Sequence, residues 1–477
     1  MILAAEFERC ADRYGGGTAV SGPDSCLGYD ALHRAGLRAA EWFGGVRAAD
    51  ERPRIGLAAR NSTAWVTAYL GILHAGAVPF LIDASASDGE LERISEDCSL
   101  DLLLHDRDAA GEAVPVLPGL TAVQRYTAGR RHPLHPDTEV CRFTSGTTGK
   151  PNCLEFSGQA VRAAAANWAA GTGMTADDRV LCCAGLSNGL AFNTSLLAAF
   201  LVGAQLHLAH GLPTSGRIRR LVAGSRATRL VAFPALYDSF VRTGGGRADF
   251  ASVRVAISSG APLRPETKER FTALTGVPMG NYYGVAEAGP LTYSTSTAAE
   301  SLGRPLPGVD IQTRGPDPQD GAVHVRSASM ATRYLNAPGL LESRIDDAGR
   351  YATGDRGRLE DGELVLTGRS HRMINVGGRK VDPVEVGEAV GAVPGVEQAV
   401  VLEAPDQHGE PAVAAVLVLR AGSDPGEVRL RLRGSLADSL AAHKIPTLIR
   451  VVDALPTTVI GKPVLHELRS LFDTGTR

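Results

Sequence analysis

Short apolar runs alternate with amphipathic segments along much of the chain. Apolar residues recur at helical spacing in residues 29–44 and 64–75, which predicts two helices. Continuous apolar runs predict buried strands at residues 54–59, 78–82, 102–105, 179–183, 205–209, 229–233 and 253–258. Most of these runs are followed by helix-like sequence. Such alternation is typical of α/β layers with largely parallel sheets.

The pattern changes after about residue 300, where Gly and Pro become frequent. Short strands predicted at residues 309–313, 321–326 and 363–367 indicate hairpins in a small β-subdomain. A compact α+β pattern follows, with elements predicted at residues 384–390, 398–403, 412–419, 427–440 and 449–452. We therefore expect an α/β fold in two parts. Residues 1–368 form a large domain of stacked mixed or parallel sheets with helices, and residues 369–477 form a small, mobile α+β domain.

Charge and hydropathy exclude several classes of protein. The net charge is −3 and the chain lacks a long basic run, so no nucleic-acid partner is expected. The most apolar window, residues 195–204, is far shorter than the ~20 residues of a membrane span. The acidic first 13 residues do not resemble a signal peptide. We expect a soluble, cytoplasmic monomer or homodimer without a membrane partner.

Cysteine and lysine usage add two expectations. The 7 Cys are odd in number and form no C-x-x-C, so reduced buried thiols are expected in place of disulfides or a zinc site. Only five of the 49 basic residues are lysines: Lys150, Lys268, Lys380, Lys444 and Lys462. Coding bias toward Arg is one explanation. The other is that Lys remains where a compact ammonium is needed, since Arg is not equivalent to it.

Residues 143–151, FTSGTTGKP, form the strongest local motif. This segment follows a strand-like stretch and precedes a predicted helix at residues 157–170. Its backbone N–H groups and hydroxyls could surround phosphate oxygens. The motif is not a Walker A loop, because Lys150 is followed by Pro151 and no Gly lies five residues before Gly149. Taken alone, it could equally be a flexible surface turn.

The loop resembles the phosphate loop of the adenylate-forming superfamily, which includes acyl- and aryl-CoA synthetases, nonribosomal-peptide adenylation domains and luciferases. Other segments resemble further motifs of that superfamily in the same order. They are HAGAVPFLID at 74–83, SSGAPL at 258–263, YGVAE at 283–287, YATGD at 351–355, the hinge segment at 368–385 and LPTTVIGKP at 455–463. The resemblance covers essentially the whole chain. Its motifs are most similar to those of stand-alone aryl-acid AMP ligases.

The resemblance implies ATP and Mg²⁺ as cofactors and gives each motif residue a role. Tyr283 would stack on adenine, Asp355 would accept the ribose hydroxyls, and Arg369 would bind phosphate or ribose oxygens. Glu287 would act in catalysis as a hard oxygen ligand of Mg²⁺, and Lys462 would stabilise the charge that builds between the acid carboxylate and the α-phosphate. Taken singly, Glu287 and Asp355 could be solvated turn carboxylates. The other ATP-binding residues implied are Thr144, Ser145, Gly146, Thr147, Thr148, Gly149, Lys150, Ser259, Gly260, Ala261, Pro262 and Gly284.

Three positions depart from the superfamily pattern. Asn152 stands where a Lys is usual, so either Lys150 supplies the charge or the loop holds pyrophosphate less tightly. His371 stands at the hinge, where Asp or Lys is usual; it is either a pH-sensitive hinge or an ordinary loop residue. Ala286 replaces the more common Thr, as it does in aryl-acid-activating members.

The resemblance implies that residues 185–197 line part of the acid pocket, and this segment contains no charge. A buried substrate ammonium would need an acidic partner, so an α-amino acid is not expected. Asn188 could face an ortho substituent of an aryl acid, or it could cap the following helix. Tyr282 should shorten the cavity and disfavour long fatty acids. The expected wall also includes Phe192, Asn193, Phe233, Gly260 and Gly284.

These observations predict an acid–AMP ligase of secondary metabolism. The carboxylate of a small aryl acid, such as a hydroxy- or aminobenzoate, would attack the α-phosphate of ATP and release pyrophosphate. The C-terminal domain would then rotate, so that residues 377–380 serve transfer to a thiol. Because only 15 residues follow Lys462, the acceptor is expected to be a separate molecule. The phosphopantetheine thiol of a carrier protein is slightly favoured and free coenzyme A is the alternative, and no sequence feature decides between them. A nitrogen nucleophile as acceptor and a non-catalytic homologue remain as rivals.

Overall fold

The computed structural model describes residues 1–23, 25–46, 52–107, 114–124, 131–144, 151–209, 214–260, 263–296, 301–317, 319–369, 373–456 and 464–472. The chain divides into two compact units. Unit 1 comprises Met1–Ala84, Ser95–Phe143 and Cys153–Ser370, and unit 2 comprises Ser85–Ile94, Thr144–Asn152 and His371–Arg477. The expected boundary after residue 368 lies beside the division at Ser370. The grouping of two earlier segments with the C-terminal residues was not expected.

The first large sheet of unit 1 has seven strands in the order β14-β13-β12-β10-β11-β1-β2. Its strands pair in parallel except for the antiparallel pair β1–β2. The central strands are apolar and buried on both faces, which confirms the expected parallel α/β layer. The bounds are β1(Thr18–Ser21), β2(Cys26–Gly28), β10(Arg179–Cys182), β11(Gln205–Leu208), β12(Arg229–Ala232), β13(Val255–Ser258) and β14(Met279–Asn281).

The second large sheet has eight strands in the order β21-β9-β8-β4-β3-β5-β7-β6. Strands β3, β4, β5 and β8 run parallel, while β6, β7 and β21 pair antiparallel at the two edges. Strand β8 leads directly into the FTSGTTGKP segment, so this sheet carries the start of the phosphate loop. The bounds are β3(Arg54–Ala58), β4(Val78–Leu81), β5(Leu102–His105), β6(Val114–Leu117), β7(Leu120–Gln124), β8(Thr138–Thr144), β9(Asn152–Ser157) and β21(Arg333–Tyr334).

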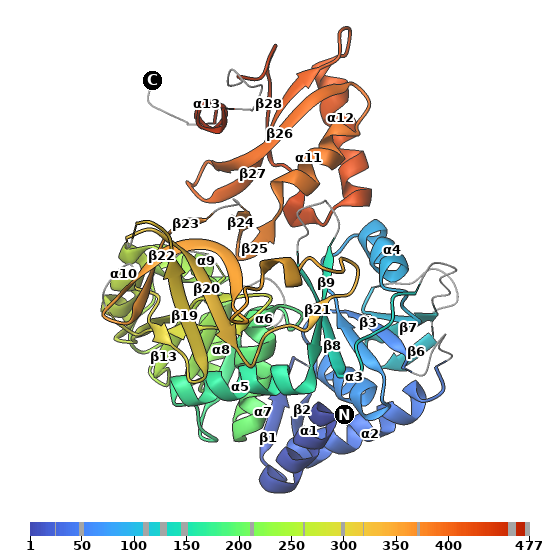
Figure 1. The fold of residues 1–477 in the computed structure, drawn as a ribbon. Helices are drawn as coiled ribbons and strands as arrows, with labels where there is room; N and C mark the ends of the chain where they lie inside the picture. The colour runs from blue at the N-terminus through green and yellow to red at the C-terminus, as the bar shows by residue number, and fades with distance from the viewer. Residues whose placement is uncertain are drawn as a thin grey trace. The chain divides into compact units, whose positions relative to one another are not determined.

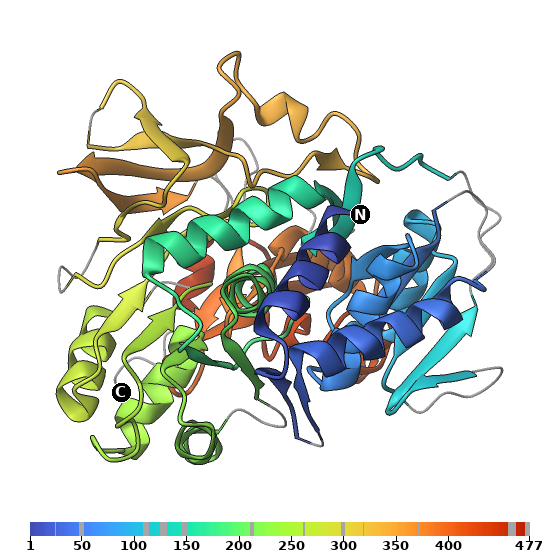
Figure 2. The ribbon, with the colours of Figure 1, turned by 90° about the horizontal axis from the view of Figure 1, so that it is seen from below.

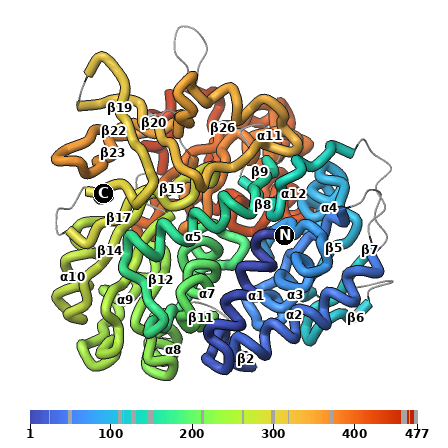
Figure 3. The backbone as a smooth tube through the Cα atoms, turned by 60° about the horizontal axis from the view of Figure 1, so that its bottom comes forward, coloured from blue at the N-terminus to red at the C-terminus, as the bar shows by residue number. Residues whose placement is uncertain are grey.

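Helices α1, α2 and α3 pack together in unit 1, and α5 lies beside α1 (Figure 2). Helix α2 approaches α3 closely because small residues face each other: a Cβ at Gly71 would lie 2.6 Å from that of Ala39. Helices α8, α9 and α10 follow strands of the seven-stranded sheet and pack in sequence order (Figure 3). The bounds are α1(Ile2–Tyr14), α2(Tyr29–Phe43), α3(Thr63–His74), α5(Gly158–Thr172), α6(Gly189–Ala191), α7(Ala198–Val202), α8(Ser215–Ser225), α9(Pro234–Thr243) and α10(Pro265–Thr275).

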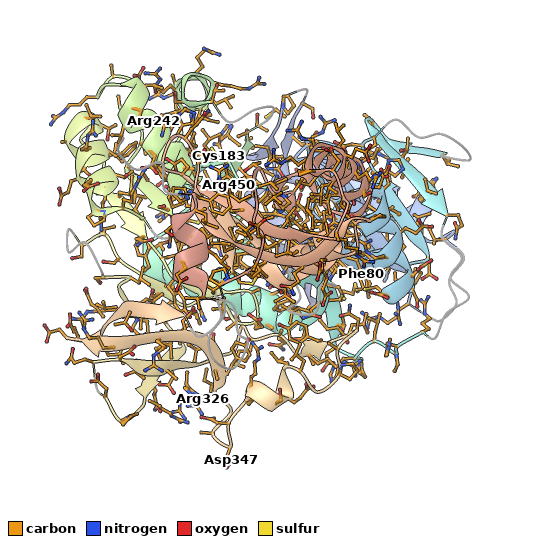
Figure 4. All side chains as sticks on the ribbon, turned by 90° about the horizontal axis from the view of Figure 1, so that it is seen from above. Phe80, Cys183, Arg242, Arg326, Asp347 and Arg450 are labelled. Carbon is orange, nitrogen blue, oxygen red and sulfur yellow. The ribbon has the colours of Figure 1, made fainter. Side chains whose placement is uncertain are left out.

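The expected small β-subdomain is an antiparallel sheet of four strands in the order β19-β20-β22-β23. Arg326 on β20 donates to the Ala348 carbonyl, beside the turn that carries Asp347 (Figure 4). Short hairpins precede this sheet and carry the YGVAE segment. The bounds are β15(Gly284–Val285), β16(Gly289–Pro290), β17(Thr292–Tyr293), β18(Arg304–Pro305), β19(Val309–Arg314), β20(Gly321–Ser327), η2(Glu342–Arg344), β22(Tyr351–Glu360) and β23(Glu363–Arg369).

Unit 2 contains the expected α+β pattern, a three-stranded sheet in the order β26-β27-β28 with helices packed on it (Figure 1). Buried valines and leucines, among them Val386, Val413 and Leu432, form its core. Helix α4 begins in this unit. The bounds are α4(Asp88–Asp97), β24(Ile374–Val376), β25(Arg379–Val381), α11(Pro383–Gly391), β26(Val396–Pro405), β27(Pro411–Leu419), α12(Pro425–Ser439), η3(Ala442–Lys444), β28(Leu448–Val451) and α13(Leu465–Ser470).

The expectation of buried thiols holds for five of the seven cysteines, whereas Cys183 is half-buried and Cys26 is exposed. All seven are free, and Cys10, Cys98, Cys141, Cys153 and Cys182 are buried. Cys26 is exposed, because it lies at the edge of the seven-stranded sheet on β2. No helix in the described part of the chain is long and apolar enough to cross a membrane.

Candidate active site

Tyr283 and Asp355, predicted to hold adenosine, lie together in unit 1. The Tyr283 hydroxyl donates to Asp355 Oδ2 at 2.6 Å, although the two residues are 72 positions apart in the sequence. Tyr283 lies just before the β15–β16 hairpin, and Asp355 lies within β22. Both side chains are largely buried, at 8% and 6% exposure. The structure therefore holds side by side the aromatic ring predicted to stack on adenine and the carboxylate predicted to accept the ribose hydroxyls.

Glu287, the predicted magnesium ligand, is half-buried and fixed from two sides. The Tyr334 hydroxyl donates to Glu287 Oε1 at 2.7 Å, and the Glu287 carbonyl accepts from the Ala331 backbone at 2.7 Å. A Mg²⁺ ion bound to nucleotide phosphates takes one or two carboxylates and otherwise water. The described residues contain no group of three or more His, Cys, Asp or Glu that could hold a metal ion by themselves. This donor set fits a nucleotide-bound Mg²⁺ better than a metal held by protein alone.

The phosphate loop begins where β8 ends, at the half-buried Thr144. The other predicted phosphate ligands, Ser145, Gly146, Thr147, Thr148, Gly149 and Lys150, lie outside the described residues. Asn152, where a lysine is usual, is the first residue of β9 and is 9% exposed.

Ser259 and Gly260 lie in the predicted adenine-side turn, and Gly284 lies in the β15–β16 hairpin that follows Tyr283. Ser259 Oγ donates to the Tyr282 carbonyl at 3.0 Å, and Gly260 has a positive φ of 86° that an L side chain rarely adopts. A Cβ at Gly284 would lie 2.5 Å from the Gly289 carbonyl oxygen, so the hairpin requires glycine there. Ala261 and Pro262 lie outside the described residues.

The expected wall of the acid pocket contains a π-helical turn, η1(Phe192–Leu197), which follows α6 directly. Such turns occur frequently at functional sites. Asn188 is the N-cap of α6, because its Oδ1 accepts from the Leu190 backbone at 2.9 Å. The structure thus favours the capping interpretation of this side chain, and its contact with an ortho substituent stays a prediction.

Tyr282 packs its ring against Trp168, with 4.8 Å between the ring centroids, and is 7% exposed. Phe192 is fully buried, and Phe233 is a half-buried residue that precedes α9. Three of the seven predicted wall residues are thus aromatic, and all seven belong to unit 1.

Arg142, which the sequence analysis did not select, lies among these residues. Its guanidinium carbon is 4.3 Å from the Phe156 ring centroid and 5.8 Å from that of Phe192. Burial lowers the pKa of Arg142 to about 10, while Tyr282, Glu287 and Tyr69 act in the opposite direction. The available signal was a single Arg inside the apolar run VCRF, directly before the phosphate loop.

Three further predicted residues have no described side chain. Arg369 ends β23, and its backbone pairs with that of Asp355 across the β22–β23 ladder. His371 and Lys462 lie outside the described residues. The hinge and the lysine of the first half-reaction therefore stay predictions.

Residues 7–335 match the AMP-binding enzyme family, and residues 385–462 match the AMP-binding enzyme C-terminal domain. The chain belongs to the AMP-binding enzyme family. Its members activate acids as adenylates at the expense of ATP, so this protein is an adenylate-forming ligase. The resemblance inferred from the motifs is thereby confirmed.

Two relatives in this family match most of the chain. The 3-hydroxybenzoate–CoA ligase of Aromatoleum sp. (strain CIB) is 27% identical over 454 residues, covering 87% of this chain and 86% of that protein. The anthranilate–CoA ligase of Pseudomonas aeruginosa is 28% identical over 470 residues, covering 88% of this chain and 87% of that protein. By their names, both relatives activate aryl acids and use coenzyme A.

Solved structures of this fold agree over nearly the whole chain. The o-succinylbenzoate CoA synthetase of Bacillus subtilis superposes with a TM-score of 0.84 at 21% identity, covering 98% of both chains. The amide bond synthetase of Marinactinospora thermotolerans superposes with a TM-score of 0.80 at 22% identity, covering 98% of this chain and 99% of that chain. These likenesses establish the fold, an α/β architecture with a large N-terminal domain and a smaller C-terminal one.

Proposed function

We propose that this protein is an aryl acid–CoA ligase, which joins a small aromatic carboxylic acid to coenzyme A. The observation that carries the proposal is the match to hydroxybenzoate– and anthranilate–CoA ligases over most of both chains. The uncharged segment at residues 185–197 and the aromatic wall around Phe192 and Tyr282 support an aryl acid. Coenzyme A replaces the carrier protein as the favoured acceptor.

In the first half-reaction an oxygen of the acid carboxylate attacks the α-phosphorus of ATP, and the bond to pyrophosphate breaks. The pair Tyr283–Asp355 would orient the nucleotide, because the 2.6 Å hydrogen bond holds Asp355 beside the ring that stacks on adenine. Glu287, oriented by Tyr334, would hold Mg²⁺, which neutralises charge on the phosphates when bound. Lys462 would stabilise the negative charge on the pentavalent phosphorus.

In the second half-reaction the thiol of coenzyme A attacks the acyl carbon of the adenylate. The carbon–oxygen bond to AMP breaks, and the thiol proton is lost to solvent. We propose that unit 2 rotates at His371 between the two half-reactions and that residues 377–380, at β24–β25, serve the second.

The choice of acceptor is testable by product mass spectrometry. The protein is incubated with ATP, Mg²⁺ and an aryl acid that it adenylates, and coenzyme A, a phosphopantetheine-bearing carrier protein or a primary amine is supplied in parallel. We expect the acyl thioester of coenzyme A as the main product. Preferential acylation of the carrier protein or the amine, with coenzyme A ignored, would contradict the proposal while leaving the adenylation step intact.

A further inference from the structure

Arg142 is a buried cation without a counter-ion among the described residues. Arg142 is only 5% exposed, and no described carboxylate forms an ion pair with its guanidinium. Its one hydrogen bond is a long contact of 3.4 Å from Nη2 to the Ala286 carbonyl, and Nε has no partner. A guanidinium has five N–H donors, and a buried charge without an anion is costly.

The surroundings of Arg142 place it in the acid-binding region of unit 1. A Cβ built on Gly189 would lie 2.6 Å from Arg142 Nη1 and 4.0 Å from Asn193 Nδ2. The guanidinium thus fills the space that a side chain at position 189 would take, within the segment expected to line the pocket. It lies over the rings of Phe156 and Phe192, Nη2 reaches the Ala286 carbonyl, and Nε has no hydrogen-bond partner among the described residues.

A second unpartnered donor lies close to the same aromatic residue. Tyr69 is 1% exposed, its hydroxyl has no hydrogen-bond partner among the described residues, and its ring packs edge-on to Phe192 at 5.5 Å. Tyr69 and Arg142 also influence each other electrostatically. The Tyr69 hydroxyl and Arg142 Nε are thus two buried donors beside Phe192 that have no acceptor among the described residues, which indicates an acceptor group that arrives with a ligand.

We propose that Arg142 is a specificity residue that pairs with a second carboxylate of the acid, so that the preferred substrate is an aromatic dicarboxylic acid. The inference rests on the proposed function. The Arg142 guanidinium lies against Phe156, Phe192 and Gly189, in the segment expected to line the acid pocket, and its Nη2 reaches the Ala286 carbonyl. The reacting carboxylate is expected beside Glu287 and ATP, so we assign Arg142 to the second carboxylate. Arg binds a carboxylate through two parallel N–H···O bonds, and the low dielectric of the buried site strengthens the pair.

The test measures acid-dependent ATP–pyrophosphate exchange with benzoate and with isophthalate, its 1,3-dicarboxylate analogue. We expect the wild-type protein to prefer isophthalate in kcat/KM. Arg142→Met should lower kcat/KM for isophthalate by about 30-fold or more, which is the order of effect when one partner of a buried charge pair is removed. For benzoate, which has no second carboxylate, kcat/KM should change by less than about 3-fold. Arg142→Lys should retain part of the preference, because it keeps the charge but not the bidentate geometry.

Gly189→Ala is the matched variant that keeps Arg142 in the chain. Its methyl group would displace the guanidinium, so it too should lose the preference for isophthalate. Thermal unfolding of each variant shows whether the fold persists. The proposal would be overturned if Arg142→Met lowered kcat/KM equally for both acids, or if the wild-type protein preferred benzoate. Neither result would contradict the proposed ligase function.

A readout independent of turnover separates this proposal from the proposed function. Isothermal titration calorimetry with isophthalate alone should give binding to the wild type that is weakened about 30-fold or more in Arg142→Met. If no acid supports exchange, the ligase proposal fails, and the titration still decides the role of Arg142. Equal binding of isophthalate to both proteins would overturn that role.

Discussion

At the scale of single residues, the site depends on contacts between side chains that are far apart in the sequence. The motifs were sufficient to select Tyr283, Asp355 and Glu287, because each stands in an ordered string of residues. They were not sufficient to show that Tyr283 donates to Asp355, or that Tyr334 holds Glu287. Arg142 was missed for the same reason: its burial is produced by Phe156 and Phe192, and no local pattern encodes those contacts.

The Tyr283–Asp355 pair gives a prediction for nucleotide binding. Tyr283→Phe keeps the ring that stacks on adenine and removes only the hydroxyl, so KM for ATP should rise by roughly 3- to 10-fold, the value of one hydrogen bond. Asp355→Asn should raise KM for ATP by roughly 10- to 100-fold, since the charged acceptor of the ribose hydroxyls is lost. Steady-state kinetics with varied ATP measure both effects.

Tyr29→Phe is the control for these variants. Tyr29 is also buried and donates to a carbonyl, that of Ala204 at 2.7 Å, but it lies on α2, outside the predicted ATP motifs. It should lower stability and leave KM for ATP unchanged. A rise in KM for Tyr29→Phe equal to that for Tyr283→Phe would show that the effect is structural.

At the scale of elements, the sequence predicted most strands and helices because buried parallel strands are continuous apolar runs. Helix α2 begins at the expected residue, Tyr29, and β5 has the expected bounds. Strand β13 begins later than expected, at Val255, because the Val253 amide is used in a turn, where it donates to the Phe250 carbonyl. The π-helical turn at Phe192 could not be predicted, since no sequence pattern separates a single π-helical turn from a regular α-helix.

A buried carboxylate joins the strands of the seven-stranded sheet. Asp178, fully buried before β10, pairs with Arg229 at 2.9 Å and with Arg254, and accepts from Thr228 at 2.6 Å. Burial alone would raise the pKa of Asp178, but these hydrogen bonds and charges outweigh it and lower the pKa. Asp178→Asn should therefore destabilise unit 1 by about 3 kcal/mol at pH 7, because Arg229 loses its counter-ion.

This effect should depend on pH. The stabilisation by the ionised Asp178 is present above the unfolded pKa of its carboxyl group and is lost as the pH falls through its lowered folded pKa. The difference in free energy of unfolding between the wild type and Asp178→Asn should therefore become smaller in acid. Urea unfolding at several pH values measures it. Asp177→Asn, at the exposed neighbouring position, should cost less than about 0.5 kcal/mol. A pH-independent difference for Asp178→Asn would count against the charge pair.

At the scale of the whole molecule, the α/β class and the C-terminal α+β pattern followed from the sequence, and family membership confirmed the function at the level of acid activation. The assignment of Ser85–Ile94 to unit 2 could not be predicted. One contact within this unit is made by Lys444, which donates to Glu90 at 2.6 Å and to Glu385 at 2.8 Å, with all three side chains buried. Lys444 is thus one of the few lysines with a structural need for an ammonium.

Lys444→Met should destabilise unit 2 in a pH-dependent way. Burial would lower the pKa of Lys444, but Glu385 and Glu90 outweigh it and raise the pKa, while burial raises the pKa of Glu385. Without the ammonium, two carboxylates remain buried, at a cost of about 3–5 kcal/mol at pH 8. Protonation of an acid whose folded pKa is raised favours folding, so part of the loss should return as the pH falls toward 5.

Chemical unfolding of the full chain, followed at pH 8 and pH 5, measures this recovery. Adding Glu90→Gln to Lys444→Met should restore part of the stability at pH 8, because one buried charge is removed. No recovery in acid and no rescue by Glu90→Gln would show that the buried ion cluster is not what stabilises this unit.

The central claim is that the protein activates an aryl acid as its adenylate, and exchange of radiolabelled pyrophosphate into ATP tests it most directly. The account predicts exchange that requires Mg²⁺ and an aromatic carboxylic acid, that is absent with α-amino acids and long fatty acids, and that is abolished in Lys462→Ala. Exchange at background level with every aromatic mono- and dicarboxylic acid, or full exchange in Lys462→Ala, would contradict it.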